Sequence, residues 1–145
     1  MTPTIRKILL PTDFGPSAAQ AAAYAAALAR GLGASVHLVH VMEGRAEWMY
    51  QERRTKLGAF ASRLVRPVTD RITVEVRTGS PAEAIVDAAI DYGVDLIVMS
   101  APARVGVPDR MVGCVAQRVL QSAPCPVLAV SQSGATRVVA GGLVA

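Results

Sequence analysis

Two short segments of the chain carry residue types that could bind an anion. Thr12 and Asp13 directly follow an apolar run, while Gly113 and Cys114 lie at the start of a helical segment. A helix N-terminus offers free backbone N–H groups to an anion, and ligands of open parallel sheets bind beyond the carboxyl ends of strands. These residues are therefore the first candidates for a binding site.

Each chemically active side chain also has a structural interpretation. Asp13 can cap the turn after its strand, and this reading stays open beside a ligand role. Cys114 at a helix start could be a reactive thiol, but no base accompanies it in the sequence. His37 and His40 lie on opposite faces of one expected strand, which favours structural roles over metal binding. We therefore predict no catalytic residue and no metal site.

Composition restricts the class of protein. Hydrophobic residues make up 52% of the 145 residues and charged residues only 18%, so part of the surface is expected to be covered, most simply by a second subunit. The net charge of +4 comes from scattered basic residues, apart from one run on Arg53–Arg66 in which aromatic and basic residues do not alternate. This pattern favours a protein with no nucleic-acid partner.

Cysteine usage and apolar runs point to a compartment. Cys114 and Cys125 have no paired spacing and no nearby histidine, which argues against a disulfide framework or a zinc site. The first apolar run is too short for a signal peptide, and the alanine-rich segment is too short to span a bilayer. We expect a reduced, cytoplasmic protein with no membrane segment.

Strands and helices alternate along the chain. Apolar runs predict strands over Ile5–Leu10, Ser35–Met42, Ile72–Arg77, Asp95–Met99 and Val127–Val130. Helical patterns fall between them, over Ala18–Ala29, Glu43–Arg66, Pro81–Tyr92 and Val112–Ser122. This alternation predicts an α/β fold, a doubly wound parallel sheet with helices on both faces.

Local signals refine these elements. Ser17 with Gln20 forms a candidate capping box, and the Ser80-Pro81 pair marks a strong helix start. Trp48 begins an apolar stripe that we expect to lie in the core, with a lid over a pocket as the alternative. Residues 1–130 are expected to form one domain. Residues 131–145 would be a flexible tail, or an edge extension through Val138 and Val139.

Five motifs, in order, resemble the universal stress protein family. They are Ile8–Asp13, His40–Val41, Gly79–Ile85, Asp95–Met99 and Ala123–Leu128. The resemblance covers Ile5 to Val130. It implies a three-layer fold with a five-stranded parallel sheet in the order 3-2-1-4-5 between four helices. It also implies a homodimer joined through the last strand.

Many members of that family bind ATP through a loop with three glycines and a Ser or Thr after the last. The matching positions here are Ser100, Ala103, Gly113 and Cys114, so only one glycine remains. The extra Cβ atoms and the weak thiol donor would hinder a close phosphate contact. Arg104 could offset this loss by pairing with phosphate.

The resemblance therefore implies a nucleotide site with a degenerate loop. The candidate cofactor-binding residues are Pro11, Thr12, Asp13, Val41, Ser100, Ala103, Arg104, Gly113, Cys114 and Val115. The leading hypothesis is a non-catalytic, dimeric cytoplasmic stress-response protein that acts through protein partners. The alternative is an ATP- or AMP-binding switch with weak or no ATPase activity. An enzyme of another class finds no support, because no nucleophile elbow is present.

Overall fold

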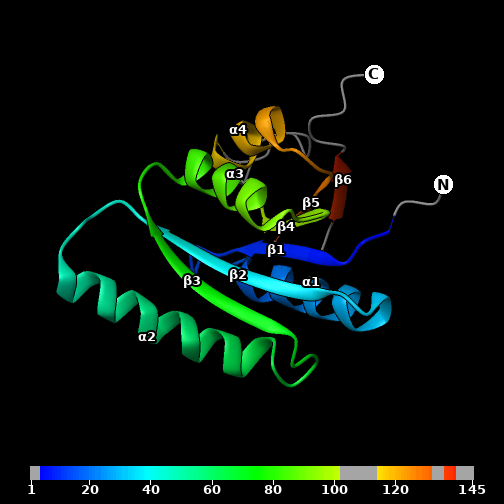
Figure 1. Ribbon diagram of the computed structural model, residues 1–145, viewed down its shortest axis with the longest axis horizontal. Helices are drawn as coiled ribbons and strands as arrows, with labels where there is room; N and C mark the ends of the chain where they lie inside the picture. Colours follow the sequence, from blue (N-terminus) through cyan, green and yellow to red (C-terminus); the bar gives the residue numbers. More distant parts are fainter. Residues whose placement is uncertain (1–3, 102–113, 132–135, 140–145) are drawn as a thin grey trace.

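A computed structural model describes residues 4–101, 114–131 and 136–139 of the chain. Strands and helices alternate from β1 to β5, as the sequence predicts (Figure 1). The elements are β1 (Lys7–Pro11), α1 (Ala18–Leu32), β2 (Ser35–Met42), α2 (Glu47–Leu64), β3 (Ile72–Thr78), α3 (Pro81–Tyr92), β4 (Leu96–Ser100), α4 (Cys114–Ser122), β5 (Val127–Val130) and β6 (Thr136–Val139).

The sheet has the order β3-β2-β1-β4-β5-β6. Strands β1 to β5 are parallel, so the predicted order 3-2-1-4-5 is confirmed. Beyond these five strands, the sequence left open either a flexible tail or an edge extension through Val138 and Val139. The structure adds β6, which pairs antiparallel with β5 and aligns Val130 with Thr136. Val138 and Val139 thus lie in an edge strand.

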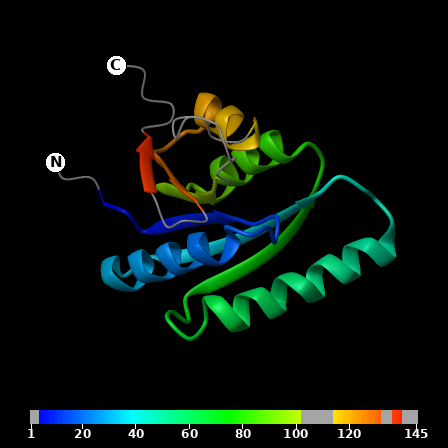
Figure 2. The ribbon, with the colours of Figure 1, turned by 180° about the vertical axis from the view of Figure 1, so that it is seen from behind.

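Helices cover both faces of the sheet. Figures 1 and 2, seen from opposite sides, both show α1 and α2 below the strands and α3 and α4 above them. This is the three-layer, doubly wound arrangement that the alternation predicts. Because β1, β2 and β4 run in one direction, their carboxyl ends share an edge of the sheet with the N-terminal ends of the helices that follow.

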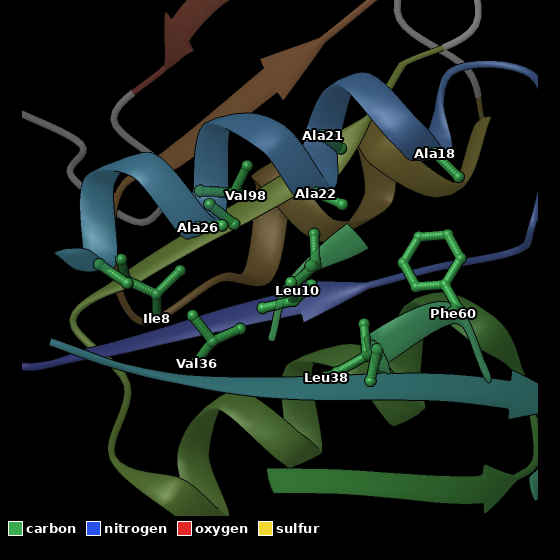
Figure 3. Packing of buried hydrophobic residues seen from close by; sticks show 14 of the residues in the cluster. Ile8, Leu10, Ala18, Ala21, Ala22, Ala26, Val36, Leu38, Phe60 and Val98 are labelled. Carbon is green, nitrogen blue, oxygen red and sulfur yellow. The ribbon is translucent and has the colours of Figure 1, made fainter. Parts of the chain in front are cut away.

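Alanines of α1 allow close packing on the lower face. Ala18, Ala22 and Ala26 lie on the side of α1 that faces the strands, opposite Leu10 and Val98 (Figure 3). All five side chains are buried. Alanine combines the highest helix propensity with a very small side chain, so this helix can pack directly against β1 and β4.

The other helices follow their local signals to different degrees. Helix α3 begins at Pro81 and ends before Gly93, whose φ of 61° is left-handed, as glycine permits. Ser17 precedes α1 with φ −93° and ψ 2° and makes no side-chain cap bond. The predicted capping box is therefore wrong, because an N-cap hydroxyl needs an extended backbone to reach the helix N–H groups.

Trp48 is also misplaced by the sequence analysis. Its side chain is 67% exposed, whereas Leu57 and Phe60 of the same helix are buried. The start of α2 extends beyond the ends of the strands at the left of Figure 1. The first turn of α2 therefore has no sheet beneath it, and the apolar stripe becomes buried only further along the helix.

Candidate functional site

A cavity of about 250 Å³ opens at the carboxyl ends of β1, β2 and β4. We call it the crevice. Its lining residues are Pro11, Thr12, Asp13, Val39, Val41, Pro81, Ile85, Met99, Ser100, Val115 and Ala116. The starts of α3 and α4 contribute to the wall, so the crevice lies where ligands of doubly wound sheets bind.

The turn after β1 supplies the polar groups of the crevice. Thr12 is buried, and its backbone N–H donates to the Val39 carbonyl at 2.9 Å. Its Oγ1 accepts the Phe14 N–H at 3.1 Å, and Asp13 Oδ1 accepts the Gly15 N–H at 2.8 Å. Asp13 therefore caps the turn, as its structural interpretation predicted. Its exposed carboxylate also lines the crevice.

His40 binds the backbone of this turn through a hydrogen bond. Its ring is buried, and Nδ1–H donates to the Thr12 carbonyl at 2.8 Å; this partner fixes the tautomer. Burial lowers the pKa of His40 below its ordinary value of 6.5, helped by the charges of Arg53 and Lys56 and opposed by the bond to Thr12. His40 is therefore neutral near pH 7, and it positions the Thr12–Asp13 turn without adding a charge.

Phe14 completes the turn in a strained conformation. Its φ is 61°, in the left-handed region that residues other than glycine rarely adopt. Its ring lies 4.6 Å from the His40 ring and 5.9 Å from the Phe60 ring, between centroids. These contacts and the bond to Thr12 offset the strain, and they hold the turn from the face of the sheet that carries α1 and α2.

The rest of the crevice is apolar. Val39 and Val41, two residues apart, lie on the same face of β2, and Ile85 lies near the start of α3. Met99 and Ala116 are buried side chains on β4 and α4. A flat, weakly polar group could lose its water against such walls, while the Asp13 carboxylate marks the polar end.

The structure gathers most of the predicted site residues. Those that line the crevice are Pro11, Thr12, Asp13, Val41, Ser100 and Val115. Cys114 is the first residue of α4, but its side chain lies outside what the structure describes. Ala103, Arg104 and Gly113 lie outside the described residues. Whether any of these residues contacts a ligand stays a prediction.

Sequence reasoning missed five wall residues, namely Val39, Pro81, Ile85, Met99 and Ala116. Two signals could have found some of them. Val39 shares a strand face with Val41, two residues away. Pro81 opens α3, and the carboxyl edge of the sheet is where such a helix starts. Ile85 and Ala116 carry no such signal, because only packing brings their helices together.

Nucleophilic and metal chemistry find no support in the described residues. Cys125 is buried, and burial raises the pKa of its thiol to about 11, so it stays protonated. No group of three His, Cys, Asp or Glu side chains that could hold a metal ion occurs in residues 4–101, 114–131 and 136–139. Within the same residues, no helix is long and apolar enough to cross a membrane.

Comparison with known proteins connects this geometry to a family. The model of the universal stress protein family matches residues 4–131. A universal stress protein of Thermus aquaticus is 36% identical over 137 residues, which cover 86% of this chain and 98% of the relative. One of Methanocaldococcus jannaschii is 30% identical over 140 residues, covering 88% and 82%.

Solved structures agree on the fold. A universal stress protein from Archaeoglobus fulgidus in complex with dAMP has a TM-score of 0.69 at 21% identity, over 88% of this chain and 98% of that chain. A universal stress protein in complex with cAMP has a TM-score of 0.70 at 19% identity, over 89% of this chain and 98% of that chain. The family model spans most of the chain and both sequence relatives reach 30% identity. The chain therefore belongs to the universal stress protein family.

Proposed function

We propose that this protein is a non-catalytic regulatory member of the family whose crevice binds an adenosine monophosphate reversibly. The observation that carries the proposal is that the Asp13 carboxylate lines a cavity whose other walls are mostly apolar. Such a cavity suits a nucleoside, which has a flat base and a hydroxylated sugar. In one such ligand, the sugar hydroxyls can bond to the Asp13 carboxylate while the base packs against the apolar walls.

The base would lie against the valines of β2. Val39 is buried and Val41 partly buried, and both side chains line the crevice. Burial of an aromatic base there removes apolar surface from water on both partners. Of the Asp13 carboxylate, Oδ1 already accepts the Gly15 N–H. The second oxygen, Oδ2, has no hydrogen-bond partner among the described residues, and it can accept from a ribose hydroxyl.

The phosphate end distinguishes a monophosphate from a triphosphate. Ser100, at the end of β4, stands where the family loop has its first glycine, and it lines the crevice. The sequence places Ala103 and Cys114 at two further positions of that loop. Added Cβ atoms and a thiol weaken a cradle made of backbone N–H groups. The β- and γ-phosphates of ATP should therefore add little affinity. The family neighbours in complex with dAMP and cAMP make a monophosphate a reasonable ligand class.

The described residues that line the crevice include no imidazole and no amine. Their carboxylate, that of Asp13, already accepts the Gly15 N–H through Oδ1, and its other oxygen is the one we assign to the ribose. General acid–base catalysis needs a group within hydrogen-bond reach of the reacting atoms. We therefore propose a binding protein that signals through partners rather than an ATPase.

We also propose that the protein works as a cytoplasmic homodimer. The resemblance implies a contact through the fifth strand, but β6 pairs with that edge of β5, so the contact we propose is through β6. Strand β6 ends the sheet, so one side of its backbone lacks a strand partner within the described residues. A second copy of the chain could pair there by a two-fold axis. Size-exclusion chromatography with light scattering tests this proposal. A monomeric mass at micromolar concentration would contradict it.

Calorimetric titration with AMP, ADP and ATP tests the nucleotide proposal. AMP and ATP should bind with affinities within about tenfold of each other, a difference of about 1.4 kcal/mol. Asp13→Asn should weaken AMP binding, whereas Asp87→Asn, an exposed residue of α3 outside the crevice, should not. Binding of no adenine nucleotide would reject the proposal. A strong preference for ATP, or steady hydrolysis, would favour the ATP-dependent switch.

A further inference from the structure

A second cavity, of about 320 Å³, lies on the face of the sheet that carries α1 and α2. We call it the Phe14 cavity. It is lined by the turn after β1, the start of α1 and one side of α2, and it shares no lining residue with the crevice. Phe14 and Gly15 belong to the same turn as Thr12 and Asp13. The two cavities therefore lie on either side of this turn.

Aromatic rings form the apolar part of the Phe14 cavity. The rings of Phe14 and Phe60 meet edge to face, with centroids 5.9 Å apart and an interplanar angle of 73°. Figure 3 shows the Phe60 ring extending toward the end of α1 that carries Ala18. Ala18 and Ala59 also line the cavity, and their small side chains leave space beside the rings. A further aromatic ring would find an edge or a face to pack on.

Two cations of α2 also line the cavity. Lys56 and Arg63 lie seven residues apart, which places them on one side of the helix. Lys56 Nζ lies 4.6 Å from the centroid of the Phe14 ring. Neither cation forms a salt bridge with an acidic side chain in the part of the chain that the structure describes, unlike Arg53, which pairs with Glu52. The cavity thus combines an apolar wall with unneutralised positive charge.

We propose that the Phe14 cavity binds an aromatic carboxylate. Its ring would pack on Phe14 and Phe60, and its carboxylate would pair with Lys56 and Arg63. The volume is at the lower end of the range for small-molecule pockets, so a single ring fits this site better than a nucleotide. A carboxylate also suits both cations, because Arg binds it through two N–H groups and Lys as a point charge.

Phenylacetate is the probe for this proposal, with phenylacetamide as its neutral counterpart and acetate as the anion without a ring. Titrations are followed by backbone amide NMR on the full chain. Phenylacetate should shift the resonances of Phe14, Ala18 and Ala59, while the amide and acetate should shift them far less. An excess of AMP should not displace the probe, because the two cavities are separate.

Matched charge-removing variants on α2 test whether Lys56 and Arg63 bind the carboxylate of the probe. Lys56→Gln and Arg63→Gln should each weaken phenylacetate binding about threefold, as expected for exposed ion pairs. Arg54→Gln removes the same charge from an exposed position of α2 outside the cavity and should leave the affinity unchanged. Equal weakening by all three variants would show only a general charge effect and reject the site.

Other results would also overturn the proposal. No shift with phenylacetate, or equal shifts with phenylacetamide, would reject an aromatic carboxylate as the ligand. Shifts confined to Val39, Val41 and Ser100 would place the probe in the crevice instead. The shifts caused by phenylacetate alone do not depend on AMP binding, so failure of the nucleotide proposal leaves this test intact.

Discussion

The two histidines of β2 are both buried, yet their surroundings differ in kind. His40 is neutral and donates one hydrogen bond to the Thr12 carbonyl, beside the Phe14 ring of the β1–α1 turn. His37, on the opposite face, bonds to the side chains of Thr73 and Glu75 on the neighbouring strand β3. One environment is apolar with a single polar contact, and the other is a polar network.

The network around His37 continues to α3. Glu75 Oε1 accepts from Arg77 Nε at 2.7 Å, and Arg77 also pairs with Asp91 at 3.0 Å. The Tyr92 ring lies 3.7 Å from the His37 ring, between centroids. Burial raises the pKa of Glu75, but hydrogen bonds from His37 and Tyr92 and the charge of Arg77 outweigh it and lower the pKa. Charge is thus shared among several partners.

The two environments predict different losses of stability when each histidine is removed. Loss of His40 leaves the Thr12 carbonyl without its partner in a turn that also carries Asp13 and the strained Phe14. Loss of His37 leaves Glu75 with Arg77, so the network can close around the gap. An unpaired buried polar group costs more than a hydrogen bond that other partners can replace.

The largest expected effect is that of His40→Ala on stability. It should lower the free energy of unfolding by about 3 kcal/mol, because it leaves a cavity and an unpaired carbonyl. Urea denaturation measures the change. His40→Asn should lose less, because its amide nitrogen can take the place of Nδ1 as the donor.

His37→Ala is the matched comparison for the other face. It should cost only about 1 kcal/mol, because Glu75 keeps its partner Arg77. A loss equal to that of His40→Ala would remove the distinction between the two environments. An equal loss for His40→Asn and His40→Ala would show that the bond to Thr12 is not what matters.

Substitutions in the loop beside the crevice should strengthen ATP binding. Ala103→Gly combined with Cys114→Ser restores two residue types of the family loop. This variant should raise ATP affinity about tenfold while AMP affinity changes little, because only the outer phosphates gain donors. Calorimetric titration of both nucleotides measures the ratio. The same pair of changes together with His37→Ala should give the same ratio, since His37 does not border the crevice.

The smallest expected effect is on how stability depends on pH, to which His40 and Glu75 contribute in different pH ranges. The folded pKa of His40 is below 6.5, so the unfolded chain binds more protons once the pH falls below 6.5, and the protein loses stability there. The folded pKa of Glu75 is below 4.5, so its contribution is present above pH 4.5 and is lost as the pH falls through the folded value.

Thermal unfolding between pH 7 and pH 3.5 separates the two contributions. His40→Asn should remove the loss of stability that begins below pH 6.5. Glu75→Gln should remove the loss that begins below pH 4.5 and leave the upper one in place. An upper transition that persists in His40→Asn would assign it to another group.

Elements with strong local signals were predictable to the residue. Strand β2, strand β5 and helix α3 have the bounds that the sequence predicts. In α3, a proline opens the helix and a left-handed glycine ends it, so the chain itself defines both bounds. Ser17 and Trp48 were predicted wrongly because cap geometry and helix overhang depend on what lies beside the segment.

The candidate site was predictable only where it lies on single segments. Thr12, Asp13, Val41 and Ser100 lie at or next to the carboxyl ends of parallel strands. Because these ends share one edge of the sheet, their meeting follows from topology. Ile85 and Ala116 enter the crevice from helices whose rotation no local pattern specifies. The partnership of His40 with Thr12 joins residues 28 positions apart, beyond the reach of a motif.

The order of β1 to β5 was implied by the resemblance of five sequence motifs to a known family. By itself, the sequence pattern determined the alternation of strands and helices and the edge at which the crevice forms. These features follow from hydrophobic periodicity and from helix-starting and helix-ending residues, which act over a few neighbours. Only the tertiary structure decided that the turn after β1 lies between two cavities. It also decided that Lys56 and Arg63 line one of them with no acidic partner among the described residues. Such arrangements come from contacts between distant segments, because packing selects which faces meet.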